Sequence, residues 1–162
     1  MYYLQNMPNI RKHDPTGSRR AFIEDMTRLL MSKGVPQAAA RLYGYLLLCA
    51  APASLDQITV DLDISKSSAS VAARLLERYT LVRRHGERGS KRALYAVSEN
   101  YEGILSEEKR LLQAMADLLE AGARIAPTGA AQQRLEVMTE FYQVILEGMD
   151  TALQKWSARK SK

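Results

Sequence analysis

The stretch Ser54–Val97, SLDQITVDLDISKSSASVAARLLERYTLVRRHGERGSKRALYAV, decides the fold. Ser54 and Ser65 are typical helix N-caps, and each precedes a short run whose apolar residues recur at helical spacing. The pattern then changes to two strand-like segments, Leu81–Arg84 and Ala93–Val97, joined by a basic loop that contains glycine. We therefore predict two short helices with a tight turn between them, followed by a β-hairpin.

This order of elements is that of a winged helix-turn-helix, whose second helix fits the DNA major groove. Small and polar side chains on the outer face of that helix let the backbone approach base edges and phosphates. A basic hairpin tip suits the narrow minor groove, where the negative potential is strong. The candidate DNA contacts are Ser54, Ser65, Lys66, Ser67, Ser68, Ser70, Val71 and Arg74 on the helices, and Arg84, His85, Arg88, Lys91 and Arg92 on the hairpin.

The positive charge of the chain is concentrated in this stretch. Between Asp63 and Arg92 there are eight basic and three acidic residues, a surplus of five that equals the net charge of +5 of the entire chain. The positive and negative charges of the other residues therefore cancel. Such a concentrated positive field is what a surface that binds a polyanion requires. A solvated basic stretch without a partner is the alternative for this charge.

The rest of the chain is mainly helical, so the predicted fold class is mainly α with a small β-wing, flanked by long N- and C-terminal dimerisation helices. We divide the chain into an N-terminal arm (1–17), N-terminal helices (18–53), the DNA-binding domain (54–98) and a C-terminal helical region (99–162). The expected flanking helices run from about 18 to 33, 36 to 50, 99 to 125 and 130 to 159.

The last of these helices indicates a homodimer. Its apolar residues alternate in spacings of three and four, and further apolar residues widen the face beyond what one helix covers. An intramolecular bundle with the helices of Phe22 and Leu111 is the alternative. The candidate dimer contacts are Phe22, Met26, Leu135, Met138, Tyr142, Ile145, Met149 and Trp156.

The central stretch resembles the winged helix-turn-helix of MarR-type bacterial transcription regulators and is most similar to the GbsR group. The residues that carry the resemblance are Ile64-Ser65-Lys66, Ser70, Arg74, Leu76-Glu77, Leu81-Val82-Arg83-Arg84, Gly86-Glu87-Arg88 and Tyr95. The chain departs from the family at Thr80, where glycine is usual, and in the wing, where Gly89-Ser90-Lys91-Arg92 is more basic and glycine-rich.

This resemblance implies a homodimeric regulator, more often a repressor, that binds a palindromic operator in double-stranded DNA. The GbsR group further implies a small-molecule effector of the choline or betaine kind, held by aromatic side chains. Conceivable walls of such a box are Tyr43, Tyr45, Tyr101, Tyr142 and Trp156, although aromatic residues at helical spacing more often belong to the core.

Several function classes are not expected. The histidines His13 and His85 belong to no catalytic set, and neither a metal motif nor a phosphate loop is present. Cys49, the single cysteine, excludes an intrachain disulfide and suits a reducing cytoplasm; we expect it to be buried and inert, with a redox-sensing thiol as the alternative. No apolar run is long enough to cross a membrane, and the N-terminus lacks the pattern of a signal peptide. A helical protein-interaction module that does not bind DNA is the alternative function.

Overall fold

The computed structural model describes residues 18–86 and 92–160. The chain divides into two compact units between Glu99 and Asn100. The N-terminal arm and two of the predicted wing contacts, Arg88 and Lys91, lie outside the described residues.

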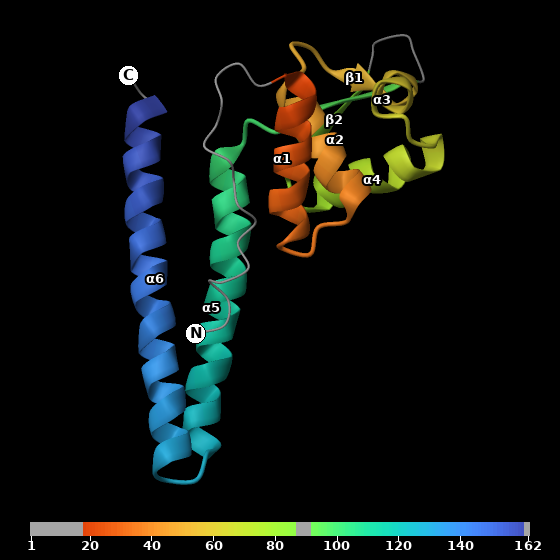
Figure 1. The fold of residues 1–162 in the computed structure, drawn as a ribbon. Helices are drawn as coiled ribbons and strands as arrows, with labels where there is room; N and C mark the ends of the chain where they lie inside the picture. Colours follow the sequence, from red (N-terminus) through yellow and green to blue (C-terminus); the bar gives the residue numbers. More distant parts are fainter. Residues whose placement is uncertain (1–17, 87–91, 161–162) are drawn as a thin grey trace. The chain divides into compact units, whose positions relative to one another are not determined.

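Four helices build most of the first unit (Figure 1): α1 (Arg19–Met31), α2 (Gln37–Leu47), α3 (Leu55–Leu62) and α4 (Lys66–Arg78). Serine caps three of them, as the sequence predicts, because a hydroxyl oxygen satisfies a backbone N–H of the first turn. Ser18 accepts a hydrogen bond from the backbone N–H of Ala21, and Ser54 accepts one from Gln57. Ser65 does the same for Ser68 at the start of α4.

The second predicted helix, expected to reach about residue 50, is α2, which ends three residues earlier, at Leu47. Leu48 already has a non-helical backbone, and its N–H turns back to the carbonyl groups of Tyr45 and Leu46. The chain must leave the helix here to reach the strand that begins at Ala53. Cys49 therefore lies just beyond the helix, and it is half-buried rather than buried.

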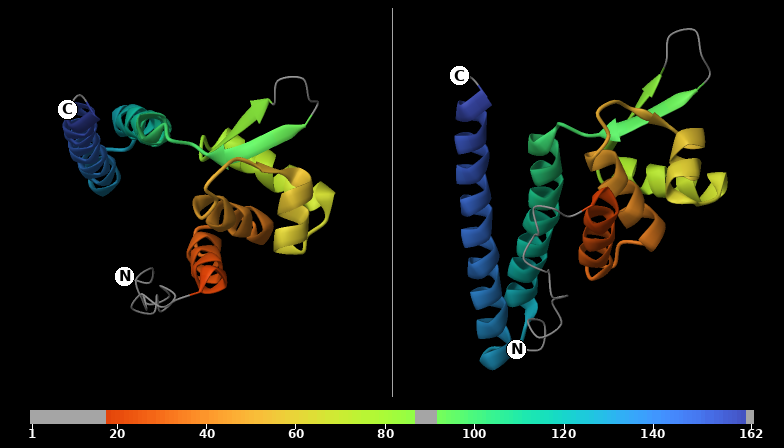
Figure 2. Two further views of the ribbon diagram at one scale, coloured as in Figure 1. Left: turned by 90° about the horizontal axis from the view of Figure 1, so that it is seen from above. Right: turned by 45° about the horizontal axis from the view of Figure 1, so that its top comes forward.

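A small antiparallel sheet completes the first unit. It consists of β1 (Ala53–Ser54), β2 (Val82–Gly86) and β3 (Ala93–Val97) in the order β1-β3-β2 (Figure 2). The predicted hairpin is β2 and β3, with Val82 opposite Val97 and Gly86 opposite Ala93. The prediction placed the first of these strands one residue too early and ended it two residues too soon. The strand β1 was not predicted, because two residues show no periodicity.

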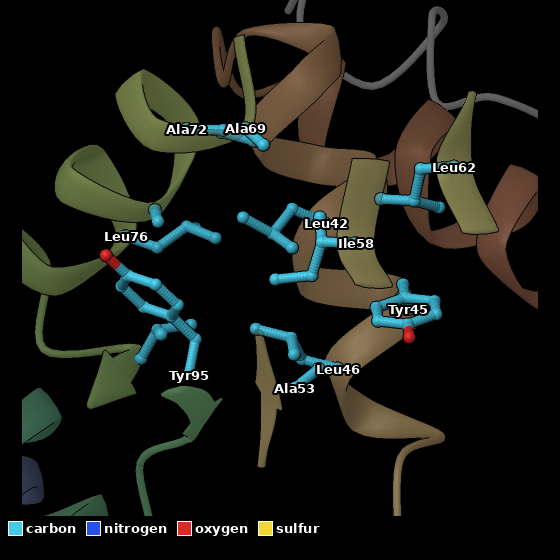
Figure 3. Packing of buried hydrophobic residues seen from close by; sticks show 13 residues of the cluster. Leu42, Tyr45, Leu46, Ala53, Ile58, Leu62, Ala69, Ala72, Leu76 and Tyr95 are labelled. Atoms are coloured by element: carbon cyan, nitrogen blue, oxygen red, sulfur yellow. The ribbon is translucent and has the colours of Figure 1, made fainter. Parts of the chain in front are cut away.

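The core of this unit fills the space between the helices and the sheet (Figure 3). Leu42 of α2, Ile58 of α3 and Leu76 of α4 are the largest fully buried side chains. Tyr95 joins them from β3, and Ala69 and Ala72 let α4 approach closely. Because these residues come from α2, α3, α4 and β3, the core fixes α4 relative to the hairpin.

Thr80, which departs from the family pattern, lies between α4 and β2 with a φ of 57°. This left-handed conformation closes the helix: the N–H of Thr80 bonds to the carbonyl of Glu77 at 2.9 Å, and that of Leu81 to Leu76 at 3.0 Å. A β-branched residue is strained there, whereas glycine is not. Glycine, which is usual here in the family that the sequence resembles, would adopt this conformation without strain.

We expect Thr80→Gly to raise the free energy of unfolding by about 1 kcal/mol, because it relieves this strain. Urea denaturation followed by circular dichroism measures the change. Thr80→Ala is the matched control, since it removes the hydroxyl but keeps the Cβ and should gain less. Equal effects of the two substitutions would contradict this explanation.

The second unit is a helical hairpin of α5 (Tyr101–Ile125) and α6 (Ala130–Lys160) (Figure 1). Asn100 caps α5 by accepting a hydrogen bond from the N–H of Gly103, so this helix begins two residues later than predicted. The two helices are antiparallel: Lys109 forms an ion pair with Asp150, and Tyr101 packs edge-on against Trp156, with ring centroids 5.6 Å apart. Among the described residues, no helix has the length and apolar character needed to span a membrane.

Candidate DNA-binding surface

The helix α4 carries most of the predicted DNA contacts, and its two faces differ sharply. Ala69, Ala72, Ala73 and Leu76 are buried on the inner face. The exposed residues on the outer side include Lys66, Ser67, Val71 and Arg74. Val71 is 60% exposed although it is apolar. An exposed valine on such a helix is free to contact the methyl group of a thymine.

The serine residues of the two helices have unequal surroundings. The hydroxyl of Ser65 lies 2.9 Å from that of Ser67 and donates to the hydroxyl of Ser68 at 2.8 Å. Ser68 is half-buried, and with Ser67 and Val71 it lines an apolar hollow beside the start of α2. Ser70 lies on another side of α4, where its side chain and carbonyl accept hydrogen bonds from Arg74. Ser54 is half-buried at the start of α3.

Basic residues from α4 and from the hairpin meet around one hollow of about 480 Å³. Lys66, Ser70 and Arg74 of α4 line it, together with Arg84 of β2 and Arg92, which precedes β3. Ser54, at the start of α3, reaches the same hollow. The structure therefore brings together predicted contacts that are up to 38 residues apart in the sequence.

In the part of the hairpin that the structure describes, the basic side chains are exposed. Val82 is buried on β2, whereas Arg83, Arg84 and His85 are exposed. Arg92 is exposed as well.

Two carboxylates, Asp56 and Glu77, also line this hollow, and neither was predicted as a DNA contact from the sequence. The ammonium group of Lys66 donates a hydrogen bond to Asp56 at 2.7 Å. This bond and the positive charge of Lys66 lower the pKa of Asp56, and the charge of Arg92 lowers it further. The carboxylate is therefore ionised at neutral pH. No local sequence pattern signals this ion pair, because Asp56 and Lys66 are ten residues apart and meet only through the packing of α3 against α4.

The predicted dimer contacts are distributed over both units. Phe22 and Met26 are half-buried on α1. Leu135, Tyr142, Ile145 and Met149 are half-buried on α6, and Leu135 is within 3.5 Å of the place that a Cβ on Gly122 of α5 would take. Met138 and Trp156 are more exposed, at 40% and 37%. Much of the predicted stripe thus lies at or near the intramolecular side of α6.

A second apolar surface of the hairpin faces solvent. It is defined here as the outer apolar surface; of its α6 residues, Met138 belongs to the predicted stripe and the others flank that stripe. Its residues are Leu111, Met115, Leu118 and Ile125 of α5, and Val137, Met138, Phe141 and Val144 of α6.

Among the aromatic residues considered for an effector box, Tyr101 and Trp156 pack against each other in the second unit, whereas Tyr43 and Tyr45 belong to the first. Tyr45 is buried, and its hydroxyl donates to Asp61 at 2.6 Å. Burial and this hydrogen bond raise the pKa of Tyr45 far above its usual value, so the phenol stays neutral. Tyr43 packs against the core of the first unit, whereas Tyr101, Tyr142 and Trp156 belong to the second. Phe141 packs edge-on against Tyr142.

Cys49 and the acidic residues offer no evident chemistry. The thiol of Cys49 donates to the carbonyl of Tyr45 at 3.4 Å and accepts from the guanidinium of Arg19 at 3.6 Å. Within residues 18–86 and 92–160, no cluster of three or more histidine, cysteine, aspartate or glutamate residues is arranged to hold a metal ion.

A capped helix pair, a tight turn and a basic hairpin on one core define a winged helix-turn-helix protein. A family model described as MmpR5-like MarR family transcriptional regulator matches residues 101–159. The HTH-type transcriptional regulator MmpR5 of Mycobacterium tuberculosis (strain ATCC 25618 / H37Rv) is 26% identical over 144 residues, which are 85% of this chain and 86% of the relative. A crystal structure of a transcriptional regulator superposes with a TM-score of 0.72 and 25% sequence identity, covering 86% of this chain and 98% of the other.

The chain is accordingly similar, in sequence and in fold, to MarR-like winged-helix transcriptional regulators. The relatives named here are described as regulators and not as enzymes. The family model and the mycobacterial relative carry the name MmpR5, and the assignment to the GbsR group stays a prediction.

Proposed function

We propose that this protein is a sequence-specific DNA-binding transcriptional regulator, and a repressor, that binds a palindromic operator as a homodimer. The observation that carries the proposal is that four basic residues line one hollow: Lys66 and Arg74 of α4, Arg84 of β2, and Arg92, which precedes β3. These four side chains are exposed. An exposed cluster of this kind on a helix-turn-helix is the electrostatic footprint of nucleic-acid binding.

In the proposed complex, α4 enters the major groove with its first turns against the base edges. Arg74 is positioned to bind a guanine edge or a phosphate, and Val71 to contact a thymine methyl. Arg84 and His85 contact the sugar-phosphate backbone. Arg92 belongs to the part of the wing that approaches the minor groove. Ser68 has a smaller role than the sequence suggests, because it is half-buried and bonded to Ser65.

The second half of the proposal, the homodimer, is supported by the outer apolar surface. On α6, Val137, Phe141 and Val144 recur at spacings of four and three, which is the spacing of a helix seam. All three are about 60% exposed, at 59%, 61% and 62%. A helix that is apolar on more than one side is normally covered by a partner. A second copy of the chain supplies that partner and a second recognition helix for the other half of a palindrome.

Salt dependence of DNA binding tests the proposal. We expect the affinity for duplex DNA to fall steeply with salt, because each phosphate contact releases counterions. Arg84→Ala should reduce the slope of log affinity against log salt by about one, since it removes one phosphate contact. Fluorescence anisotropy with labelled duplexes at several salt concentrations measures both quantities.

Arg110→Ala on α5 is the matched control, because this exposed arginine lies outside the hollow; its slope should equal that of the unsubstituted protein. Selection of bound fragments from random DNA then yields the operator, which should be an inverted repeat with half-sites about one helical turn apart. Affinity that ignores salt, or no binding at low salt, would favour a protein-interaction module instead.

The small-molecule effector is the last part of the proposal. The resemblance to the GbsR group implies choline or betaine-like compounds. Tyr45 does not contribute to such a site, because it is buried in the core and its hydroxyl donates to Asp61. Calorimetry with choline and glycine betaine tests the ligand class. Heat of binding together with a changed DNA affinity would support it, and the lack of both would remove it.

A further inference from the structure

The carboxylate of Asp56 lies inside the proposed DNA-binding surface. Asp56 belongs to the first turn of α3, and Lys66 to the first turn of α4. Their side chains form an ion pair with an N–O distance of 2.7 Å, although they are 62% and 67% exposed. Both line the hollow that Arg74, Arg84 and Arg92 also line. A negative charge thus lies among the basic residues of this surface.

This carboxylate acts on cations from two elements. It accepts a hydrogen bond from Lys66 of α4, and its pKa is lowered by the charge of Arg92 beside β3 as well. Both cations are proposed DNA contacts, and the structure brings them to the same acidic group. No other acidic residue of the described chain forms an ion pair with Lys66.

A carboxylate and a phosphodiester are both oxyanions, and both accept hydrogen bonds from ammonium and guanidinium groups. An ion pair this exposed contributes little to stability, so one anion is readily exchanged for another. From this geometry we propose that Lys66 and Arg92 form a phosphate-binding site for DNA that the carboxylate of Asp56 occupies in the free protein. Asp56 then lowers the affinity for DNA, because a phosphate must displace the carboxylate from the two cations and still lies close to its negative charge. This inference rests on the proposed function.

The proposal predicts a gain of function on neutralisation. Asp56→Asn removes one negative charge close to the bound phosphate and frees Lys66 to bind it. We expect DNA affinity at low salt to rise about five- to tenfold for operator and random duplexes alike. The slope of log affinity against log salt should become steeper by about one, as one more cation pairs with DNA.

The experiment uses the full chain, labelled duplex DNA and fluorescence anisotropy at several salt concentrations. Asp117→Asn on α5 is the matched control: it makes the same change of net charge at an exposed aspartate outside the hollow. Lys66→Ala provides the second background, in which Asp56→Asn should gain less because Arg92 alone remains to bind the phosphate. Circular dichroism of each variant verifies the fold.

Each outcome decides a different point. A rise in affinity confined to Asp56→Asn and reduced in the Lys66→Ala background supports the site. Equal affinities and slopes for Asp56→Asn, Asp117→Asn and the unsubstituted protein would overturn it while leaving DNA binding intact. If the unsubstituted protein binds no DNA at low salt, the proposed function itself fails.

Discussion

Phe141→Glu is expected to convert the proposed dimer into a monomer and to lower the affinity for the proposed operator by about 10²–10⁴-fold. The side chain is 61% exposed in the centre of the α6 part of the outer apolar surface. A carboxylate buried there against a second copy would lose its hydration without gaining a partner. In a dimer, binding of one subunit holds the other at a high effective concentration near the second half-site. A monomer lacks this gain, which accounts for the loss of affinity.

Sedimentation velocity measures the oligomeric state, and anisotropy with an operator duplex measures the affinity. Gln143→Glu is the matched control, since it adds the same charge at an exposed polar position of the same helix and should leave the dimer intact. Phe141→Lys separates the two causes of weaker binding, because it disrupts the dimer without adding a charge that repels DNA. A Phe141→Glu protein that remains dimeric would refute this interface.

The second large effect is expected in the core. Leu76→Ala should lower the free energy of unfolding of the first unit by about 2–5 kcal/mol, through lost burial and the cavity left behind. Leu76 is 1% exposed and lies on the inner face of α4, between α2 and Tyr95 of the sheet (Figure 3). The substitution therefore weakens the attachment of the recognition helix itself.

Urea denaturation measures the loss. Val71→Ala on the same helix is the control, because this side chain is 60% exposed and its truncation should change the stability by no more than about 0.5 kcal/mol. A loss at Leu76 as small as that at Val71 would contradict the packing described for α4. For the DNA affinity of the folded protein the order is reversed: Val71→Ala should lower it more than Leu76→Ala, since Val71 belongs to the proposed contact face and Leu76 does not.

The helix-turn-helix was predictable from the sequence because its signals are local. Ser54 and Ser65 cap the two short helices, and the apolar residues that follow keep the helical period. The hairpin was predictable for the same reason. The boundaries of α2 and β2 were not, since they depend on where the chain must turn to reach β1 and on the pairing of Gly86 with Ala93.

The candidate site was predictable only in part. Its cations are visible as a local excess of charge, but Asp56 lies ten residues before Lys66, and only the packing of α3 against α4 shows that they meet. On α6, periodicity identified an apolar face without showing which residues α5 covers. Leu135 contacts α5, whereas Phe141 is exposed, although both are apolar residues of one helix.

Trp156 is the chain's single tryptophan, and it packs against Tyr101 near the open end of the α5–α6 hairpin. Its emission therefore reports on the hairpin alone, without any label. Comparing its thermal melting curve with the dichroism of all the helices would reveal whether the two units lose their structure in one cooperative step or one after the other.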